Sequence, residues 1–489
     1  MSLILPGVEI QVVKEIITGQ LNPSGVLGLV GITENKLDGT PPEPGRASSF
    51  KEFKGLFGKS VDQTVPEAKQ AFQNGVDEIV MIPVIGSTLN PASAELKGKS
   101  GETVFKLTAR APGVWGNRIN IKIEPKKDDT GKRSMCKVIL KTPNAVEVFN
   151  NLNLDPEHER FFCTVINRES ELVKARSPKS SGKTGKNKKG SDKKTDDSGS
   201  EGLSGSKEMP VEVDTALTGG TTATLKDYEN AIAKLESEED VDIVVASIED
   251  HSDISMVKKV HATIESHCKV MSENCMNRIG FGTVPPSSQF EDVQAEVAHI
   301  TKQTLTMNSD RFVLVAPYGY IGAVAGLIGN LQVHESPTFK SLSGIGAFNH
   351  KYSPSNLKEL LKANILAIEA KKGKGIIIEK GIATSGEQIS VTRVADRAVR
   401  GTKLIGDQFI GTLNSITGRN ALREKCIEFF LQMEKDGAIV PNADGSEPSH
   451  KVDVYATDDD ISKGIVRLDI AVRPVRAIDY IYGTILVRA

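Results

Sequence analysis

The sequence is poor in cysteine and nearly free of net charge. Its 489 residues include five cysteines, an odd number scattered along the chain, and the formal net charge is −2. Few and scattered cysteines argue against a disulfide framework and are typical of a reducing compartment. The charge balance gives no general attraction to nucleic acid or to anionic lipid. We therefore expect a protein that is cytoplasmic in the producing cell and has no nucleic-acid partner.

The sequence also lacks long hydrophobic runs. Its longest apolar stretches have the length of a strand, and no basic segment followed by an apolar one stands at Met1. This pattern predicts no direct membrane insertion. The hydrophobic fraction of 38% and the charged fraction of 25% are typical of a globular protein. The length predicts about three domains.

Phosphate-binding signatures are missing as well. Gly-Lys-Ser/Thr triplets occur at residues 58–60, 98–100 and 182–184, but each lacks the upstream glycine that a P-loop requires. The Gly-x-Gly-x-x-Gly fingerprint of dinucleotide-binding folds is also absent. We therefore predict no nucleotide cofactor.

Motifs for metal binding and nucleophilic catalysis are equally absent. His261, His267, Cys268 and Cys275 are near one another in the sequence, but without the paired short spacings of a metal site. Neither HExxH nor GxSxG occurs. We predict that the protein is not an enzyme and has no catalytic, cofactor-binding or metal-binding residues. An α/β enzyme of unidentified type and a structural polymer that does not contract remain as alternatives.

Strands and helices alternate in two separated parts of the chain. Residues 26–32 and 78–84 are continuous apolar runs, and helices are predicted between them at 50–57, with Ser49 as the cap, and at 65–74. Continuous apolar strands are expected where helices cover both faces of a parallel sheet. In the second part, helices are predicted at 225–235, 255–267, 291–304, 322–329 and 357–370, and strands at 241–247, 278–284, 311–316 and 376–379.

An insert separates these two parts. Residues 21–100 and 216–380 are predicted to form one α/β sandwich domain, and residues 101–215 a β-rich insert. Residues 177–206, rich in Lys, Ser and Gly, contain a single large apolar residue and are predicted to be a disordered, solvated loop that does not bind nucleic acid. Short strands are expected in the insert at 103–109, 119–123 and 137–141, and less clear ones at 146–151 and 161–166.

Residues 381–489 are predicted to form a small α+β C-terminal domain. One clear helix is predicted in it, at 419–436, with Thr417 as a cap and Gly437 at its end. The face of this helix opposite its apolar residues carries charges of both signs. A turn is predicted at 458–460. The apolar residues of the helix recur at helical spacing, at Leu422, Cys426, Phe429, Phe430 and Met433.

Both ends of the chain are apolar. Residues 464–489 begin with strict alternation of apolar and polar residues, the period of a half-buried strand, and continue with a β-branched and aromatic run. Residues 3–13 are a second apolar strand. Such ends aggregate unless they are paired. Two predictions stay open: the terminal strand pairs inside its own domain, as many terminal strands do, or it is donated to a neighbouring subunit.

Several short segments are spread over nearly the whole chain and are informative when taken together in order. They are PGVE at 6–9, GLVGIT at 28–33, PGVWGN at 112–117, VIN at 165–167 with Ser170, LTGG at 217–220 before Asp227 and Tyr228, Ala325-Gly326, Ser336-Pro337, LSG at 342–344, Gly381-Ile382 before Arg393, and Pro474. In these segments the chain resembles the contractile tail sheath proteins of bacteriophages and related contractile injection systems. The run at 177–206 is not a general feature of that family.

The resemblance implies that terminal strands are exchanged between subunits. An N-terminal arm, residues 1–20, and the terminal donor strand would join a small sheet in the C-terminal domain of a third subunit. It implies stacked hexameric rings around an inner tube, which contract to drive the tube through a target envelope. The implied partners are further copies of the chain, the inner tube protein, and baseplate and terminator or cap proteins of a phage virion or tail-like particle. The exchanging residues would be Leu5, Val8, Ile10, Val12, Ile481, Ile485 and Val487.

Within that resemblance, the helix at 419–436 is our first choice for tube contact. Charges of both signs on its outer face suit a weak interface that can break during contraction. The alternative is an ordinary packed helix with a solvated outer face. The predicted contact residues are Arg419, Arg423, Lys425, Glu428 and Lys435.

Overall fold

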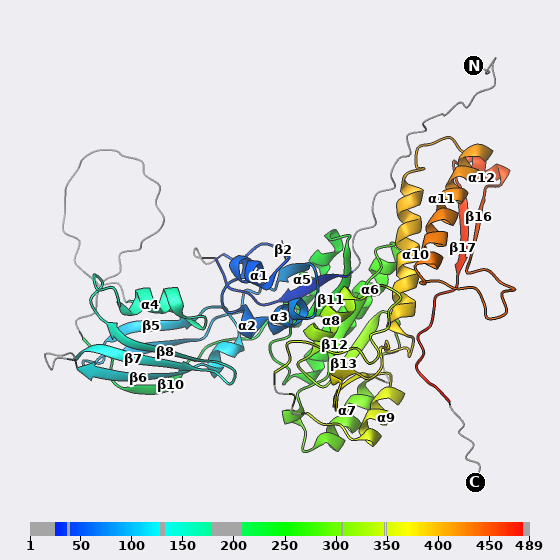
Figure 1. The fold of residues 1–489 in the computed structure, drawn as a ribbon. Coiled ribbons are helices and arrows are strands. Elements are labelled where there is room, and N and C mark those ends of the chain that lie inside the picture. Colours follow the sequence, from blue (N-terminus) through cyan, green and yellow to red (C-terminus); the bar gives the residue numbers. More distant parts are fainter. Residues whose placement is uncertain are drawn as a thin grey trace, which may run out of the picture.

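The computed structural model describes residues 25–36, 40–127, 133–177, 208–304, 307–346, 348 and 350–482. Figure 1 shows three parts in a row: a β-rich insert, a central sheet covered by helices, and a C-terminal part in which long helices pack beside a two-stranded sheet. The run predicted to be disordered, 177–206, lies outside the described residues except for Ser177.

The central sheet has eight strands in the order β15-β14-β13-β12-β11-β1-β3-β2. The inner strands are parallel, and the edge strands β2 and β15 pair antiparallel with their neighbours. Because β1 lies between β3 and β11, the sheet joins segments from both sides of the insert. The strands are β1 (Val26–Gly31), β2 (Gly45–Ala47), β3 (Ile79–Pro83), β11 (Val241–Ala246), β12 (Ile279–Thr283), β13 (Phe312–Ala316), β14 (Leu366–Lys371) and β15 (Gly375–Ile378).

Helices cover both faces of this sheet and create two apolar cores, which confirms the predicted α/β class. Side chains of β1 alternate between the cores: Val30 joins one and Leu29 the other. The predicted cap is also confirmed, because the Ser49 side chain accepts a hydrogen bond from the backbone N–H of Glu52. One face carries α1 (Phe50–Phe57), α2 (Val61–Thr64), α3 (Pro66–Gln73) and α8 (Ile321–Asn330), and the other α5 (Leu225–Lys234), α6 (Ile254–Glu273), α7 (Val293–Thr304) and α9 (Pro354–Lys362).

The insert, together with β4 just before residue 101, contains two antiparallel sheets, β10-β6-β7-β8 and β4-β5-β9, around a third apolar core. The strand predicted at 161–166 is wrong, because Phe162–Glu169 forms helix α4. Phe162, Cys163, Val165 and Ile166 are all buried, and their spacing places them on one helical face. The strands are β4 (Ser93–Lys97), β5 (Thr103–Ala109), β6 (Asn120–Lys127), β7 (Arg133–Lys141), β8 (Val146–Asn153), β9 (Val173–Arg176) and β10 (Val213–Ala216).

The helix predicted at 357–370 is wrong in its second half. Helix α9 ends at Lys362, and Asn364 has a left-handed backbone with φ of 57°. The chain then forms β14, which pairs in parallel with β13. Leu366 and Ile368 are fully buried, on the face that carries α8. Burial between neighbouring strands therefore overrides the local preference for helix.

The C-terminal part contains α10 (Ile389–Asp407), α11 (Ile416–Lys435), β16 (His450–Tyr455), α12 (Asp458–Ser462) and β17 (Arg467–Val472). Helix α10 was not predicted. Ser415 caps α11 in place of the predicted Thr417, by accepting from the N–H of Gly418 at 3.0 Å. The turn predicted at 458–460 forms the first turn of α12. Gly437 follows α11 with a φ of 76°, as a C-terminal glycine does.

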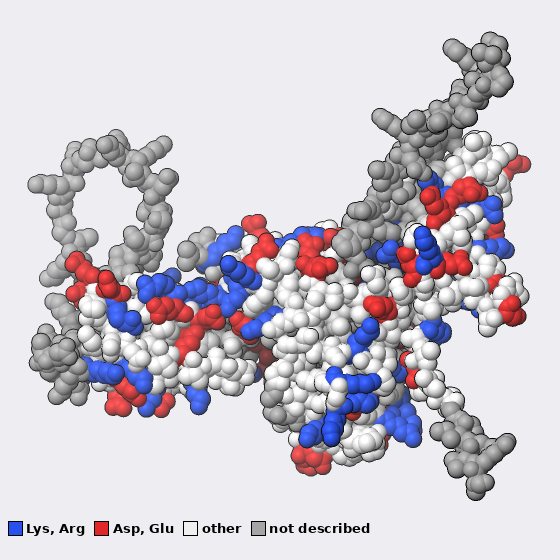
Figure 2. Space-filling view, in the orientation of Figure 1, with Lys and Arg blue, Asp and Glu red and all other residues white. Residues whose placement is uncertain are grey.

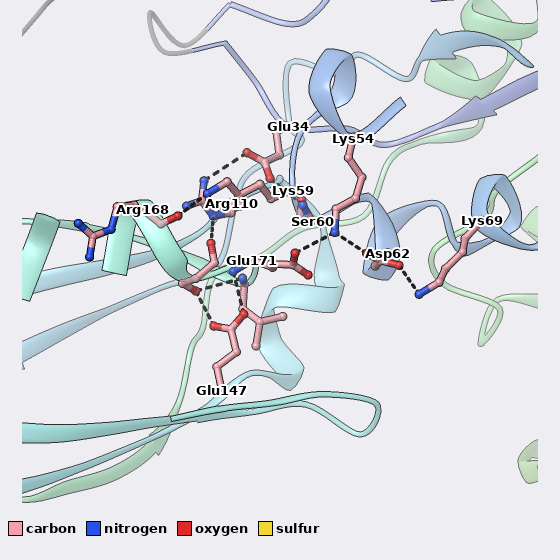
Figure 3. A network of polar contacts seen from close by, with 12 residues as sticks. Glu34, Lys54, Lys59, Ser60, Asp62, Lys69, Arg110, Glu147, Arg168 and Glu171 are labelled. Atoms are coloured by element: carbon pink, nitrogen blue, oxygen red, sulfur yellow. Dashed lines mark hydrogen bonds and ion pairs between the residues drawn. The ribbon is translucent and has the colours of Figure 1, made fainter. Parts of the chain in front are cut away.

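A polar network connects the insert to the central part (Figure 3). Lys54 of α1 lies 2.8 Å from Glu171 of the insert, and the Lys59 ammonium donates to the carbonyl of Arg168. Glu34 accepts from the N–H of Ser60 at 2.7 Å, and the guanidinium of Arg110 lies 3.7 Å from it. The triplet at 58–60 therefore contributes to the contact between the two parts.

Candidate functional site

An open apolar groove of about 720 Å³ lies between α10, the start of α11 and β17. The floor is the small C-terminal core, in which Phe430 of α11 is fully buried. At the rim, where α10 turns into α11, Leu413 is 86% exposed. The groove is also lined by Phe409, Leu422, Leu468, Ile470 and Val472.

One side of the groove is strand β17. It pairs antiparallel with β16, and in the part of the chain that the structure describes no strand pairs with its other edge. Leu468, Ile470 and Val472 are half-buried toward the C-terminal core, whereas Asp469 and Ala471 are exposed. This first half of the predicted terminal strand thus pairs within its own chain. An unpaired edge beside an apolar groove can accept another strand.

The C-terminal segment beyond β17 exposes large apolar side chains. Ile481 is 87% exposed and Tyr482 95% exposed, and Ile478 is exposed as well. Ile481 is therefore accessible to another molecule. The other residues predicted to exchange, Leu5, Val8, Ile10, Val12, Ile485 and Val487, lie outside the described residues.

The residues predicted for tube contact lie on α11 but have different surroundings. Two of them bind their own chain: Arg419 donates to the Asn414 side chain at 2.7 Å, and Arg423 to the Val452 carbonyl at 3.1 Å. Lys425 forms an ion pair with Glu428 at 3.0 Å. Glu428 and Lys435 are exposed. Among the charged residues of α11, Glu424, Glu428 and Lys435 are thus exposed, and Lys425 is half-buried.

The charged side chains that the structure describes have mixed signs and form no metal-ligating group. Figure 2 shows positive and negative residues intermixed over the visible face. Among the residues that the structure describes, no group of three or more His, Cys, Asp or Glu side chains could hold a metal ion. In the same residues, no helix combines the length and apolar character needed to span a bilayer.

Comparison with protein families matches two consecutive parts of the chain. Residues 221–384 match the phage tail sheath protein central domain, and residues 384–488 match the phage tail sheath C-terminal domain. Together these matches cover more than half of the 489 residues. The chain belongs to the phage tail sheath family. The groove, α10, α11 and β17 all lie within the matched regions.

Solved sheath structures share the fold of this tail sheath chain. The sheath tail protein from Desulfitobacterium hafniense is 15% identical, with 96% of this chain and 97% of that chain covered and a TM-score of 0.51. The helical sheath of the anti-feeding prophage in its contracted state is 12% identical, with 99% of both chains covered and a TM-score of 0.54. The PVC sheath complex of an extracellular contractile injection system, also contracted, is 10% identical, with 99% and 98% covered and a TM-score of 0.56. Curated protein sequences give no match.

Helix α10 is the part of the sheath groove that sequence reasoning missed. Its buried face includes Arg393 and Asp396 as well as apolar residues, so no continuous apolar stripe marks it. Asp396 is paired with Arg311 at 2.6 Å, and Arg393 donates to the carbonyl of Leu331 at 3.0 Å. A usable signal was the long stretch without proline between residues 389 and 407.

Proposed function

We propose that this protein is the sheath subunit of a contractile tail or injection machine. Subunits polymerise as stacked hexameric rings around an inner tube and contract to drive the tube through a target envelope. The observation that carries the proposal is the open groove beside the unpaired edge of β17 in a chain of the tail sheath family. The backbone N–H and C=O groups of such an edge lack a strand partner until another strand pairs with it.

Strand exchange fills the groove in this proposal. The arm at 1–20, with Leu5, Val8, Ile10 and Val12, and the terminal strand, with Ile481, Ile485 and Val487, come from neighbouring subunits and extend the β16-β17 pair. Two observations support this arrangement: Ile481 is exposed, and the side chains of Leu468, Ile470 and Val472 on β17 are half-buried. Main-chain pairing holds subunits together while their bodies rotate and slide against one another.

Contraction is then a rearrangement of the subunit lattice, and it proceeds without nucleotide hydrolysis. Subunits are held in an extended lattice and relax to a contracted one with more contact between them. Two of the similar solved structures are sheaths in the contracted state, which supports a contractile role. The insert, residues 101–215, faces outward and the C-terminal domain, residues 381–489, faces the tube.

The outer face of α11 contacts the inner tube in this proposal. Glu428 and Lys435 provide exposed charges of both signs, with the half-buried Lys425 beside them, and the neighbouring Leu431 is exposed. Exposed ion pairs contribute little free energy, so a tube contact made of them is easily broken. Arg419 and Arg423 support the helix through their contacts to Asn414 and Val452. Baseplate and terminator or cap proteins bind the two ends of the polymer.

Electron microscopy of the purified protein tests this function, alone and co-expressed with the products of neighbouring genes. We expect hollow, striated cylinders, and with the inner tube present we expect two classes, one long and narrow and one short and wide. Small particles of uniform size under all conditions would contradict the proposal. Cylinders of a single length and width would favour a structural polymer that does not contract.

A further inference from the structure

The chain does not leave its own subunit directly after β17. Residues 473–480 run back toward the central part, and Figure 1 shows this red segment leaving the C-terminal helices. The first contacts are with the turn after α11. Val440 donates its backbone N–H to the carbonyl of Arg473, and Val475 to the carbonyl of Ala438, both at 3.0 Å. The start of the segment is therefore fixed to the C-terminal part.

The next contact is made by a single buried side chain, Gln388. Its Oε1 accepts from the N–H of Ala477 at 3.0 Å, and its Nε2 donates to the carbonyl of the same residue at 3.1 Å. Nε2 also donates to the carboxylate of Asp479 at 2.8 Å. The amide thus pairs with both backbone groups of one residue, as a neighbouring strand would, and fixes the register of the segment.

Charged residues hold the segment on both sides of this amide. Arg476 forms two hydrogen bonds with Glu387, each 2.9 Å long. Lys380 lies 3.5 Å from the carboxylate of Asp479 and donates to the Tyr480 hydroxyl at 3.3 Å. Two parallel bonds from a guanidinium to one carboxylate define direction as well as position.

Two large aliphatic side chains near the end of the segment, Ile478 and Ile481, take no part in holding it. Ile478 and Ile481 are exposed, although they are the residues that would normally attach a terminal strand by burial. The attachment of residues 476–480 is therefore mainly polar, and it leaves Ile478 and Ile481 available.

Helix α10 connects this attachment to Gly25, which directly precedes β1. Gln388 is the N-cap residue of α10, and its side chain binds the C-terminal segment and makes no cap hydrogen bond. Three turns later, Arg400 forms an ion pair with Asp242, which also accepts from the N–H of Gly25. One helix thus fixes residue 25 and residues 476–480 relative to the groove.

We propose that Lys380, Glu387 and Gln388 form a clamp that sets the direction in which the apolar C-terminal segment leaves its subunit toward a neighbour. This role rests on the proposed strand exchange. Without the clamp, the segment would remain attached through residues 473–475 but would sample many directions, and fewer copies would reach a neighbouring groove.

Hydrogen exchange on the full-length, unassembled subunit tests the clamp itself. In Gln388→Ala we expect the Ala477 amide to exchange about tenfold faster, because its only described acceptor is lost. Arg476→Glu should also accelerate exchange at 476–480, and the charge reversal Glu387→Arg with Arg476→Glu should restore protection. Lys463→Glu is the matched control, since it breaks an exposed ion pair with Asp459 elsewhere in the C-terminal part. Unchanged exchange in Gln388→Ala would overturn the clamp.

Polymer length under the electron microscope tests the role of the clamp in assembly. We expect Gln388→Ala and Arg476→Glu to give few and short cylinders, and the reversed pair to restore them. Faster exchange together with polymers of normal length would overturn the directing role and leave the proposed function intact. If the wild-type protein forms no cylinders, the proposed function fails, while the exchange data still decide whether the clamp exists.

Discussion

Glu249, which follows β11 in the central part, accepts a hydrogen bond from the backbone N–H of Trp115 in the insert. Two sequence-distant parts are thereby joined at a further point, in addition to the network of Lys54 and Glu171. Burial raises the pKa of Glu249 to about 7, from an ordinary 4.5. The carboxyl group is therefore protonated in the folded protein over a pH range in which it ionises in the unfolded chain.

Glu249→Gln should stabilise the protein at alkaline pH. The raised pKa means that the contribution of Glu249 to stability is complete below pH 4.5 and is lost as the pH rises through 7. An amide keeps an acceptor for the Trp115 N–H and cannot ionise, so we expect a gain of up to roughly 3 kcal/mol at pH 8 and little change at pH 4.5. Urea unfolding at both pH values measures this.

Asp250→Asn is the matched control for Glu249→Gln. Its carboxylate accepts from Ser252, and its pKa is lowered, so this variant should lose stability at pH 8. Equal destabilisation of Glu249→Gln at both pH values would show that the contact needs a carboxylate.

Two buried histidines and one half-buried histidine should make the protein sensitive to acid. Burial lowers the pKa of His251 to about 4, of His261 to about 3 and of His267 to about 4. The unfolded chain binds protons near the ordinary value of 6.5, so the free energy of unfolding falls as the pH drops from 6.5 toward 4. We expect a loss of roughly 1 kcal/mol per histidine at pH 5.5.

The measurement is urea unfolding between pH 7 and pH 5. His261→Gln serves as the comparison, because a glutamine in the same buried position does not titrate. This variant should be less stable at pH 7 and should take up one proton fewer on unfolding at pH 5.5. A stability that stays constant between pH 7 and pH 5 would contradict the assignment.

Ile470→Glu should abolish assembly without unfolding the subunit. Ile470 is half-buried in β17 and lines the groove, so a carboxylate there disfavours an incoming apolar strand. Ala471→Glu is the matched control, since Ala471 is exposed on the other face and lies opposite Lys451. Sedimentation and circular dichroism should show folded subunits for both variants and polymers only for the control. Normal polymers from Ile470→Glu would exclude the groove as the acceptor.

Removal of either terminal segment should leave folded, soluble subunits. Deletion of residues 1–15 or 475–489 removes a proposed donor, and the second deletion also removes the clamp contacts of Arg476 and Ala477. We expect unfolding midpoints close to that of the full chain and no polymers. Polymers of normal length, or aggregation during purification, would show that the deleted residues serve another purpose.

Local patterns predicted the centre of the fold well. The continuous apolar run at 26–32 corresponds to the buried strand β1, and Ser49 caps α1. The wrong and missing element predictions have a common cause. Burial in the tertiary structure, and not the local sequence pattern, determines these elements. The apolar residues of β14 suit a helix as well as a strand, and the neighbouring β13 determines the outcome. Buried charges such as Asp396 conceal α10.

The site was predictable only in part. The alternation from Val466 to Val472 indicated a strand with one buried face, and the structure pairs Arg467–Val472 with β16. The groove was not predictable, since one of its sides is formed by α10. The contact between Gln388 and Ala477 joins residues that no local pattern relates. The exchange of strands and the contact of α11 with the tube stay predictions.

A cryo-electron microscopy map of the assembled polymer tests the central claim most directly. The strand-exchange account predicts continuous density for an extended chain along the open edge of β17, connected to a neighbouring subunit and placing apolar side chains over Leu468 and Ile470. If that edge is unpaired in the polymer, or if the chain that pairs with it belongs to the same subunit, the account is contradicted.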